Sequence, residues 1–221
     1  MGLFKSQEEI DNSPVQNFGD YRVGDIKYLD VNGDGIVDSQ DKIYLGYTTM
    51  PEITYGFGAT VAWKGFDLNL FFQGVGHVNF FVSGSSITTP FSDNEATRRA
   101  VQQDVWKKGW RSDRTETENA AAAYPRLTVG TGVGYENNRQ TSSWWQRNGA
   151  FLRLKNAEIG YSFPKAWMVR TGFVQSLRVY VAANNLCTFS KFKLWDPELG
   201  GGQGAVYPPN RYISFGLNVN F

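Results

Sequence analysis

The sequence is poor in the residues that build disulfides and zinc sites. Its 221 residues include one cysteine, Cys187, and one histidine, His77. One cysteine cannot form a disulfide within the chain, and these two residues cannot supply a zinc site made of several Cys and His ligands. We therefore interpret both as ordinary packing or surface positions.

The chain also lacks an excess of charge of either sign. It has 22 basic and 21 acidic residues, a formal net charge of +1. No run of lysine and arginine is long enough to follow a phosphate backbone, so nucleic acid is not an expected partner. Carboxylates are plentiful, but none lies in a recognisable catalytic pattern, and we do not expect an enzyme.

Long apolar runs are missing as well. No window approaches the ~20 consecutive apolar residues of a transmembrane helix, and the first five residues lack the apolar core of a signal peptide. Aromatic residues nevertheless make up 15% of the chain, beside 24 glycines. This combination is typical either of a soluble protein or of a membrane β-barrel whose strands carry their apolar residues in alternation.

Alternation is clearest in the last stretch of the chain, Tyr212–Phe221. Apolar residues occupy every second position from Ile213 onwards, and small or polar residues lie between them. This period of two predicts a strand with one apolar and one polar face. The apolar face has to contact either a protein core or lipid, and the sequence leaves both open at this point.

The same pattern predicts further strands upstream. Residues 54–73 predict a hairpin with a tight turn at Lys64-Gly65, and Phe151–Phe163 and Leu177–Asn184 predict two more strands. Short and long connections alternate along the chain. Every long loop therefore falls at one end of the predicted strands and every short turn at the other end, and we call these two ends the rims. The long insert after the hairpin contains a helix expected at Glu95–Trp106.

The two rims and the strand number define the expected fold class. Trp63 and Trp167 fall at the rim with short turns, where an aromatic girdle is typical. Five such strands cannot close, because a barrel needs roughly eight. We therefore predict an all-β chain that forms the C-terminal strands of a large antiparallel transmembrane barrel, with residues 1–53 as an extracellular loop and 54–221 as barrel strands and loops.

The most specific chemical motif is the twelve-residue block Asp30–Asp41. Oxygen side chains occupy positions 1, 3, 5, 9 and 12, with glycine at position 6, as in an EF-hand loop. The candidate ligands are Asp30, Asn32, Asp34, Asp38 and Asp41 with the backbone carbonyl of Ile36. Six oxygens suit Ca²⁺, so the spacing predicts a structural calcium ion.

Two features of this block depart from an EF-hand. Asp41 replaces the usual glutamate, which shortens the reach for bidentate contact and favours weaker affinity or a smaller ion. The flanking residues predict strand rather than helix, which argues against a signalling switch. The other interpretation of the block is a solvated acidic turn without a metal.

Three tryptophans outside the predicted strands are candidates for stacking on sugar rings: Trp144, Trp145 and Trp195. Interfacial or loop packing is the more ordinary explanation for exposed aromatic residues of this kind. If they bind sugar, the chain has a second interpretation, namely a soluble, calcium-stabilised β-sandwich that binds carbohydrate.

Short motifs follow one another along the chain in a recognisable order. They are Gly2–Ile10, Gly24–Tyr28 followed by Asp30–Gly35, Tyr55–Phe57, Lys64–Asp67, Phe71–Gly74, Tyr124–Arg126, Phe151–Asn156, Gly160–Pro164, Asn184–Leu186 and the closing Phe221. Together they resemble the late region of SusC/RagA-type TonB-dependent outer-membrane transporters of Bacteroidetes. The resemblance covers essentially the whole chain.

The resemblance implies a function for the protein to which this segment would belong. Such proteins form a large barrel with an internal plug in the outer membrane of Gram-negative bacteria. They pair with a SusD-like surface lipoprotein and import oligosaccharides or peptides with energy delivered through TonB. It also implies that Phe221 is the signal for the barrel-assembly machinery, and that this chain, without the plug and the TonB-contacting segment, does not transport by itself.

Overall fold

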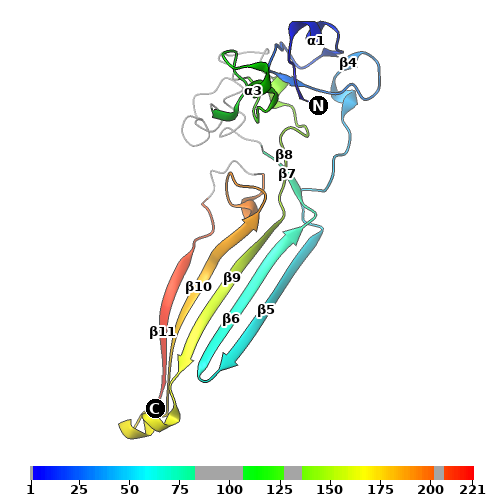
Figure 1. Cartoon of the computed structure of the whole chain (residues 1–221). Coiled ribbons are helices and arrows are strands. Elements are labelled where there is room, and N and C mark those ends of the chain that lie inside the picture. The colour runs from blue at the N-terminus through cyan, green and yellow to red at the C-terminus, as the bar shows by residue number, and fades with distance from the viewer. Residues whose placement is uncertain (1, 83–106, 127–135, 202–206) are drawn as a thin grey trace. The chain divides into compact units, whose positions relative to one another are not determined.

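The computed structural model describes residues 2–82, 107–126, 136–201 and 207–221 (Figure 1). The chain divides into two compact units. Residues 47–79, 148–200 and 207–221 form what we call the sheet unit. Residues 1–46, 80–147 and 201–206 form the loop unit. The predicted helix at Glu95–Trp106 lies outside the described residues.

The sheet unit contains a five-stranded antiparallel sheet (Figure 1). Its strands are β5 (Ile53–Trp63), β6 (Phe66–Gly76), β9 (Phe151–Ser162), β10 (Ser176–Ser190) and β11 (Tyr212–Asn220). They lie in the order β5-β6-β9-β10-β11, so that each strand pairs with the next one along the chain. The hairpin and the three later strands predicted from alternation are confirmed.

The hairpin turn follows its predicted chemistry. Lys64 and Gly65 both have positive φ, 48° and 89°. Positive φ at both central residues is the signature of a type I′ turn, whose twist matches that of the flanking strands. Trp63 precedes this turn and Trp167 lies in the short connection after β9, which contains α4 (Lys165–Met168) and a 3₁₀ turn at Val169–Thr171. Both indoles are exposed.

Strand register places the apolar residues of all five strands on one face. Val181 of β10 lies between Ile159 of β9 and Phe215 of β11. On the other side of β9, Leu68 of β6 pairs with both Ile159 and Val61. These side chains are open, since Phe215 is 82% and Val61 60% exposed. Within the described part of the chain, no second layer covers this face.

The opposite face is polar and carries an ion-pair network. Arg178 of β10 donates to the carboxylates of Asp67 on β6 and Glu158 on β9, the latter at 2.6 Å. These bonds tie three adjacent strands together through side chains. Phe71 is an apolar exception on this polar face. Its ring lies 3.4 Å from the position that a Cβ would take at Gly58.

A row of irregularities crosses the middle of the sheet at one level. Asn156 of β9 pairs with Phe71, but Leu154 pairs with Phe72, so that Lys155 is an extra residue in β9. On β10 the pairing jumps from Asn184 to Cys187 across the same point. An extra residue reverses the parity of a strand. Accordingly, the apolar face of β9 holds odd-numbered residues on one side of Lys155 and even-numbered ones on the other.

The loop unit is built from short elements. Strand β1 (Gly2–Leu3) pairs antiparallel with β3 (Ile26–Lys27), and β2 (Val15–Gln16) pairs parallel with β4 (Ile36–Val37). Helix α1 (Gln7–Asp11) is capped by Ser6, and α3 (Glu116–Ala120) is capped by Thr115. This unit also has 3₁₀ turns at Ser39–Asp41 and Asn137–Arg139. Strands β7 (Asn79–Phe81) and β8 (Gln146–Asn148) pair with each other, and a 3₁₀ turn at Pro197–Leu199 belongs to the sheet unit.

None of the helices in the described ranges is long and apolar enough to cross a membrane.

Candidate functional site

Buried amide side chains hold the centre of the loop unit. Asn138 accepts the N–H of Ile26 at 2.9 Å and donates to Asp25 at 2.9 Å. Asn137 and Gln16 each donate to the carbonyl of Ile26 at 3.0 Å. These amides bond the backbone N–H and carbonyl of Ile26 on the edge of β3 that does not pair with β1. They take the place of a neighbouring strand there. They join residues more than a hundred positions apart in the sequence.

Asp25 is the charged member of this network. Its side chain is 2% exposed and pairs with Arg126 at 2.8 Å. It also accepts the backbone N–H of Arg22 at 2.8 Å. Both oxygens of the carboxylate therefore have hydrogen-bond partners, and its charge is paired. Without these partners, burying the charged group would be costly. Tyr28, also buried, donates its hydroxyl to the carbonyl of Asn137 at 2.6 Å, and burial raises its pKa.

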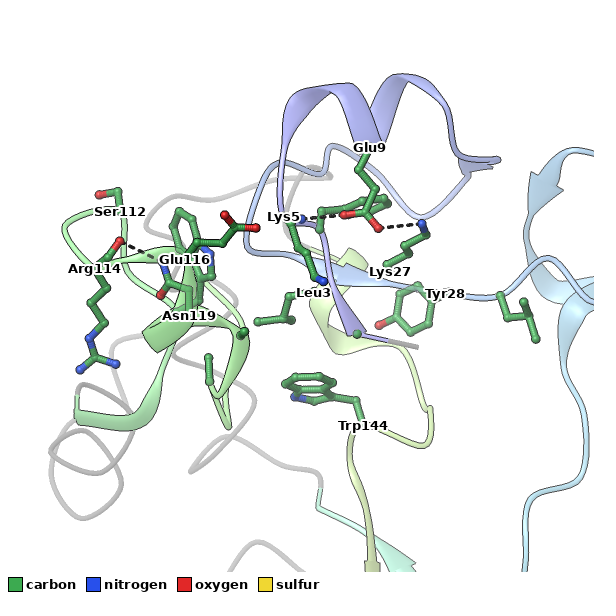
Figure 2. A pocket seen from close by; sticks show the side chains of 16 residues that line it. Leu3, Lys5, Glu9, Lys27, Tyr28, Ser112, Arg114, Glu116, Asn119 and Trp144 are labelled. Atoms are coloured by element: carbon green, nitrogen blue, oxygen red, sulfur yellow. Dashed lines mark hydrogen bonds and ion pairs between the residues drawn. The ribbon is translucent and has the colours of Figure 1, made fainter.

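A cavity of about 790 Å³ opens in the loop unit beside β1 (Figure 2). Ligand sites typically measure about 300–1,000 Å³. Its walls come from residues within 2–9, 27–29 and 110–122, together with Trp144. The buried amide network and the Asp25–Arg126 pair bring these segments of the chain together. Figure 2 shows Lys5, Glu9 and Lys27 on one side and Ser112, Arg114, Glu116 and Asn119 on the other.

One wall of the cavity carries an ion pair at the start of α1. Glu9 accepts from the ammonium of Lys27 and from the backbone N–H of Lys5, both at 2.8 Å. These two bonds, the one to Lys27 first, lower the pKa of Glu9. The Lys5 ammonium makes no ion pair with any described residue, but its charge also helps to lower the pKa of Glu9.

The other wall is a loop fixed by its own hydrogen bonds. Arg114 donates to the carbonyls of Gly109 at 2.8 Å and Lys107 at 2.7 Å. Asn119 donates to the carbonyl of Arg111 at 2.8 Å. The carboxylate of Glu116 forms no ion pair within the described ranges, which leaves a free anion on the wall that faces Lys5.

Two tryptophans, Trp110 and Trp144, also line the cavity. Trp110 packs so closely on Gly24 that a Cβ at this position would lie 2.4 Å from the indole ring. Gly24 also has φ of 90°, so glycine is required there for two reasons. The partly exposed ring of Trp144 lies across the cavity from Ser112 (Figure 2).

The three tryptophans named from the sequence have different environments. Trp144 lines the cavity. Trp145 is 2% exposed and donates its indole N–H to the carbonyl of Asn138 at 2.8 Å, which makes it a core residue of the loop unit. Trp195 belongs to the sheet unit, packs edge-on against Phe192 and donates to the carbonyl of Gly200. Stacking of these residues on a substrate stays a prediction.

Sequence reasoning missed Lys5, Trp110 and Glu116 as cavity residues. Nothing in the local sequence marks them, because a single lysine, tryptophan or glutamate in a loop is commonplace. What these three residues share is that the fold brings them to the same cavity. That arrangement depends on contacts of Gln16 with Asn137 and of Ile26 with Asn138, which lie far apart in the sequence.

The predicted cation loop forms a series of tight turns. Asp30 accepts the N–H groups of Gly33 and Gly35 at 2.6 and 2.9 Å, and Asp34 accepts that of Ile36 at 2.9 Å. Asn32 accepts the N–H of Asp34 at 2.9 Å. Such side-chain turns form without a metal ion. Nowhere in the described ranges do three or more Asp, Glu, His or Cys side chains gather closely enough to hold a metal.

Asp41 closes this loop. One of its oxygens accepts the N–H of Val31 at 2.7 Å, and the other accepts that of Asp38 at 2.8 Å. These bonds, that to Asp38 first, lower the pKa of Asp41. Because the folded pKa lies below the ordinary value of about 3.9, the stabilisation is present above that pH and is lost as the pH falls through the folded pKa.

Phe221 stays exposed at the end of the sheet unit. Its side chain is 73% exposed, and its ring stacks on that of Phe173 with 6.1 Å between centroids. An assembly role for Phe221 stays a prediction.

Comparison with known proteins identifies relatives over the full length of the chain. TonB-dependent receptor P26 of Formosa agariphila is 32% identical over 100% of this chain and 22% of its own length. TonB-dependent receptor SusC of Bacteroides thetaiotaomicron is 28% identical over 99% of this chain and 19% of its own. The chain thus spans about a fifth of these relatives. No family model matches it.

Solved structures share the fold. The RagAB peptide importer in its closed-closed state superposes with a TM-score of 0.66 at 21% identity, covering 100% of this chain and 22% of that one. A structure of the RagAB peptide transporter gives a TM-score of 0.62 at 23% identity, covering 84% of this chain and 19% of that one. The comparisons confirm both the resemblance and the fold class expected from the sequence.

Proposed function

We propose that this chain, a homologue of the SusC/RagA-type TonB-dependent receptors over its whole length, forms five adjacent strands in the wall of an outer-membrane transporter. In that setting the apolar face of the sheet contacts lipid and the polar face lines the barrel interior. The long connections, with residues 1–53, lie on the extracellular side.

The observation that carries this proposal is the unpartnered apolar face. A water-soluble protein seldom exposes so continuous an apolar surface. Here it extends over all five strands, and the residues on it that are more than half exposed include Phe57, Val61, Phe66, Ile159, Ile213, Phe215 and Leu217. The strands have 9 to 15 residues, and about 9–11 suffice to span a bilayer. A β-sandwich would need a second large sheet over this face, and the described part of the chain has none.

The parent protein is proposed to import oligosaccharides or peptides with a SusD-like surface lipoprotein, TonB and a plug domain. Support comes from the relatives, since one is SusC and the matched RagAB structure is a peptide importer. In this role the chain contributes wall and loops rather than catalysis. The barrel-assembly machinery is the proposed reader of Phe221.

Spin labelling of the whole receptor tests the placement of the sheet. Cys187 is replaced by serine, and one cysteine is introduced in turn at Ile213, Ser214, Phe215, Leu217 and Asn218. In lipid vesicles we expect labels at the odd positions to collide mainly with oxygen, which concentrates in lipid, and labels at the even positions to collide mainly with a water-soluble nickel chelate. Collision rates measured by electron paramagnetic resonance report both. Equal access to the nickel chelate at odd and even positions would contradict the proposal.

A structural Ca²⁺ at Asp30, Asn32, Asp34, the Ile36 carbonyl, Asp38 and Asp41 is our second proposal. Its support is the donor spacing and the presence of oxygen donors only, which suit a hard cation. The turn geometry gives the same residues a metal-free role, so that the two explanations have to be separated by experiment.

Metal removal separates them. If the loop binds Ca²⁺, millimolar Ca²⁺ slows amide exchange at Gly35 and Ile36 in the whole receptor, because binding only to the folded loop stabilises it by mass action. EDTA reverses the effect, and Asp30→Asn abolishes it. Exchange measured by mass spectrometry that is identical in Ca²⁺ and EDTA would leave the loop as a metal-free turn.

A further inference from the structure

A groove of about 460 Å³ lies over strand β10 on the apolar face of the sheet. Its lining includes Val179 and Val181 of β10 and larger residues on the two neighbouring strands, namely Ile159 and Tyr161 of β9 and Phe215 and Leu217 of β11. Each valine pairs with one of these larger residues on either side. The valines therefore form the floor of the groove. The larger side chains form its two walls, whose strands are about 10 Å apart because neighbouring strands are separated by about 4.8 Å.

The groove is close to the end of the sheet with the short connections, which we call the short-turn rim. Phe66, which also lines the groove, is the first residue of β6. Tyr161 is the last residue but one of β9, and Val179 is the fourth residue of β10. The β5–β6 turn and the connection after β9 lie at this same end of the sheet (Figure 1). A ligand in the groove would therefore be within a few residues of both connections.

A series of aromatic rings joins the groove to the short-turn rim. The rings of Phe66 and Tyr161, both in the groove, have their centroids 4.6 Å apart. Tyr161 contacts Phe163 edge-on at 5.1 Å. Phe163 in turn contacts Trp167 of α4 at 6.0 Å. Apolar surface therefore continues from the groove to the connection after β9.

The two short connections carry positive charges and no negative side chain. Lys64 lies in the β5–β6 turn, and Lys165 and Arg170 lie in the connection after β9. All three side chains are exposed, and none of them forms an ion pair with a residue in the described part of the chain. The N–H of Ser162 donates to the carbonyl of Gly65 at 2.7 Å, which holds the two connections side by side. The short-turn rim is therefore a basic surface next to an apolar groove.

We propose that the groove holds one acyl chain of an anionic phospholipid, whose phosphate is bound at the short-turn rim by Lys165, Arg170 and Lys64. The inference rests on the proposed function, because it names a partner for the lipid-facing side of the sheet. The groove matches the chain in polarity, and the three cations match the headgroup in charge. Lysine and arginine have long apolar stems, so their charged groups reach a phosphate while the stems stay on apolar surface. Basic groups near a membrane surface strengthen the binding of anionic lipid.

The same features disfavour other occupants. A neutral phospholipid would fill the groove but would leave the three cations without a counterpart. A free phosphate would meet the cations but would leave the groove empty. An α-helix of a protein partner is about 10–12 Å across with its side chains, and it does not fit between walls whose strands are about 10 Å apart.

Native mass spectrometry of the purified whole receptor in detergent tests the charge part of the proposal. The receptor is mixed with equal amounts of dioleoyl phosphatidylglycerol and dioleoyl phosphatidylcholine, and the retained lipid is identified by its mass. We expect about tenfold more phosphatidylglycerol than phosphatidylcholine in the receptor with one lipid bound. Lys165→Gln and Arg170→Gln should each lower this preference about fivefold, whereas Lys165→Arg keeps it, because the charge is retained. Lys193→Gln, at an exposed lysine near the opposite end of the sheet, is the matched control and leaves the preference unchanged.

A tryptophan in the floor tests the groove. Val181→Trp fills the space between Ile159 and Phe215, so that the retained phosphatidylglycerol should fall about tenfold, as for the loss of two buried methylene groups. Val61→Trp is the matched control, because Val61 lies in the same cross-strand row of the apolar face but outside the groove. It adds the same bulk and should leave retention unchanged. The heat-sensitive gel mobility of the barrel confirms that each variant is folded before it is compared.

Four outcomes overturn the inference: equal retention of the two lipids, a preference that survives replacement of all three cations, equal effects of Val181→Trp and Val61→Trp, or displacement of the lipid by glycerol 3-phosphate, which has no acyl chain. Failure of the wall proposal is recognised separately, because it appears in the spin-label pattern of β11. A lipid-facing pattern there, together with equal retention of the two phospholipids, would refute the lipid site alone.

Discussion

Asp25→Ala is expected to destabilise the loop unit locally by about 3–5 kcal/mol, the usual cost of removing one partner of a buried ion pair. The substitution leaves the guanidinium of Arg126 without its carboxylate and removes the acceptor for Asn138 and for the N–H of Arg22. Since Asn138 also holds Ile26, strand β3 loses its orientation together with the charge.

Amide exchange at Ile26 and Tyr28 in the whole receptor measures this effect. A loss of about 3–5 kcal/mol corresponds to exchange that is faster by a factor of roughly 10² to somewhat under 10⁴. Asp113→Ala is the control. It removes the carboxylate from an exposed pair with Arg111, in which Asp113 is 61% exposed. Such surface pairs contribute about 0–1 kcal/mol. Similar acceleration in both variants would show that the buried pair has no special role.

Phe215→Arg is expected to impair assembly of the receptor in the outer membrane. Phe215 is 82% exposed near the middle of β11, on the proposed lipid face opposite Val181. Arginine on the lipid face of a barrel costs about 2–4 kcal/mol at the bilayer midplane. The loss of an aromatic side chain from lipid adds to this cost, so that the fraction of folded receptor should fall severalfold.

Ser214→Arg provides a control on the neighbouring residue. Ser214 lies on the same strand but faces the polar side, opposite Ala182, and is exposed. Arginine there points into the proposed aqueous interior, next to a face that already carries Arg178 with two carboxylates. The folded fraction, read from the heat-sensitive gel mobility of the barrel, should stay near that of the unsubstituted protein. Greater damage from Ser214→Arg than from Phe215→Arg would reverse the assignment of faces.

The strands were predictable because their pattern is local. In β5 and β11 alternation continues without interruption, and every residue from Thr54 to Trp63 falls on the face that its parity predicts. In β6 it is broken only by Phe71. In β9 the parity reverses at Lys155, where an extra residue enters the ladder. The sequence Phe151–Asn156 contains no glycine or proline to mark this reversal. Only the pairing with neighbouring strands defines it.

The candidate site was less predictable, for a different physical reason. The acidic loop at Asp30–Asp41 was found from spacing, since a turn motif is encoded by adjacent residues. The cavity depends on contacts such as Gln16 with Asn137, 121 positions apart. Asparagine and glutamine occur mostly on surfaces, so that no property of the sequence indicates that these amides are buried and hold a strand.

The row of extra residues at Lys155 and at Asn185–Leu186 has a consequence for how such a wall evolves. A residue inserted elsewhere in β9 would move every side chain beyond it to the opposite face of the sheet. Lipid-facing and water-facing groups would then be exchanged along that part of the strand. At this level the neighbouring strands already deviate together, and Asn185 adopts a positive φ of 53°. The sheet therefore has one level at which extra residues are accommodated without exchanging its faces, and we expect strand lengths in related proteins to differ there before they differ elsewhere in the sheet.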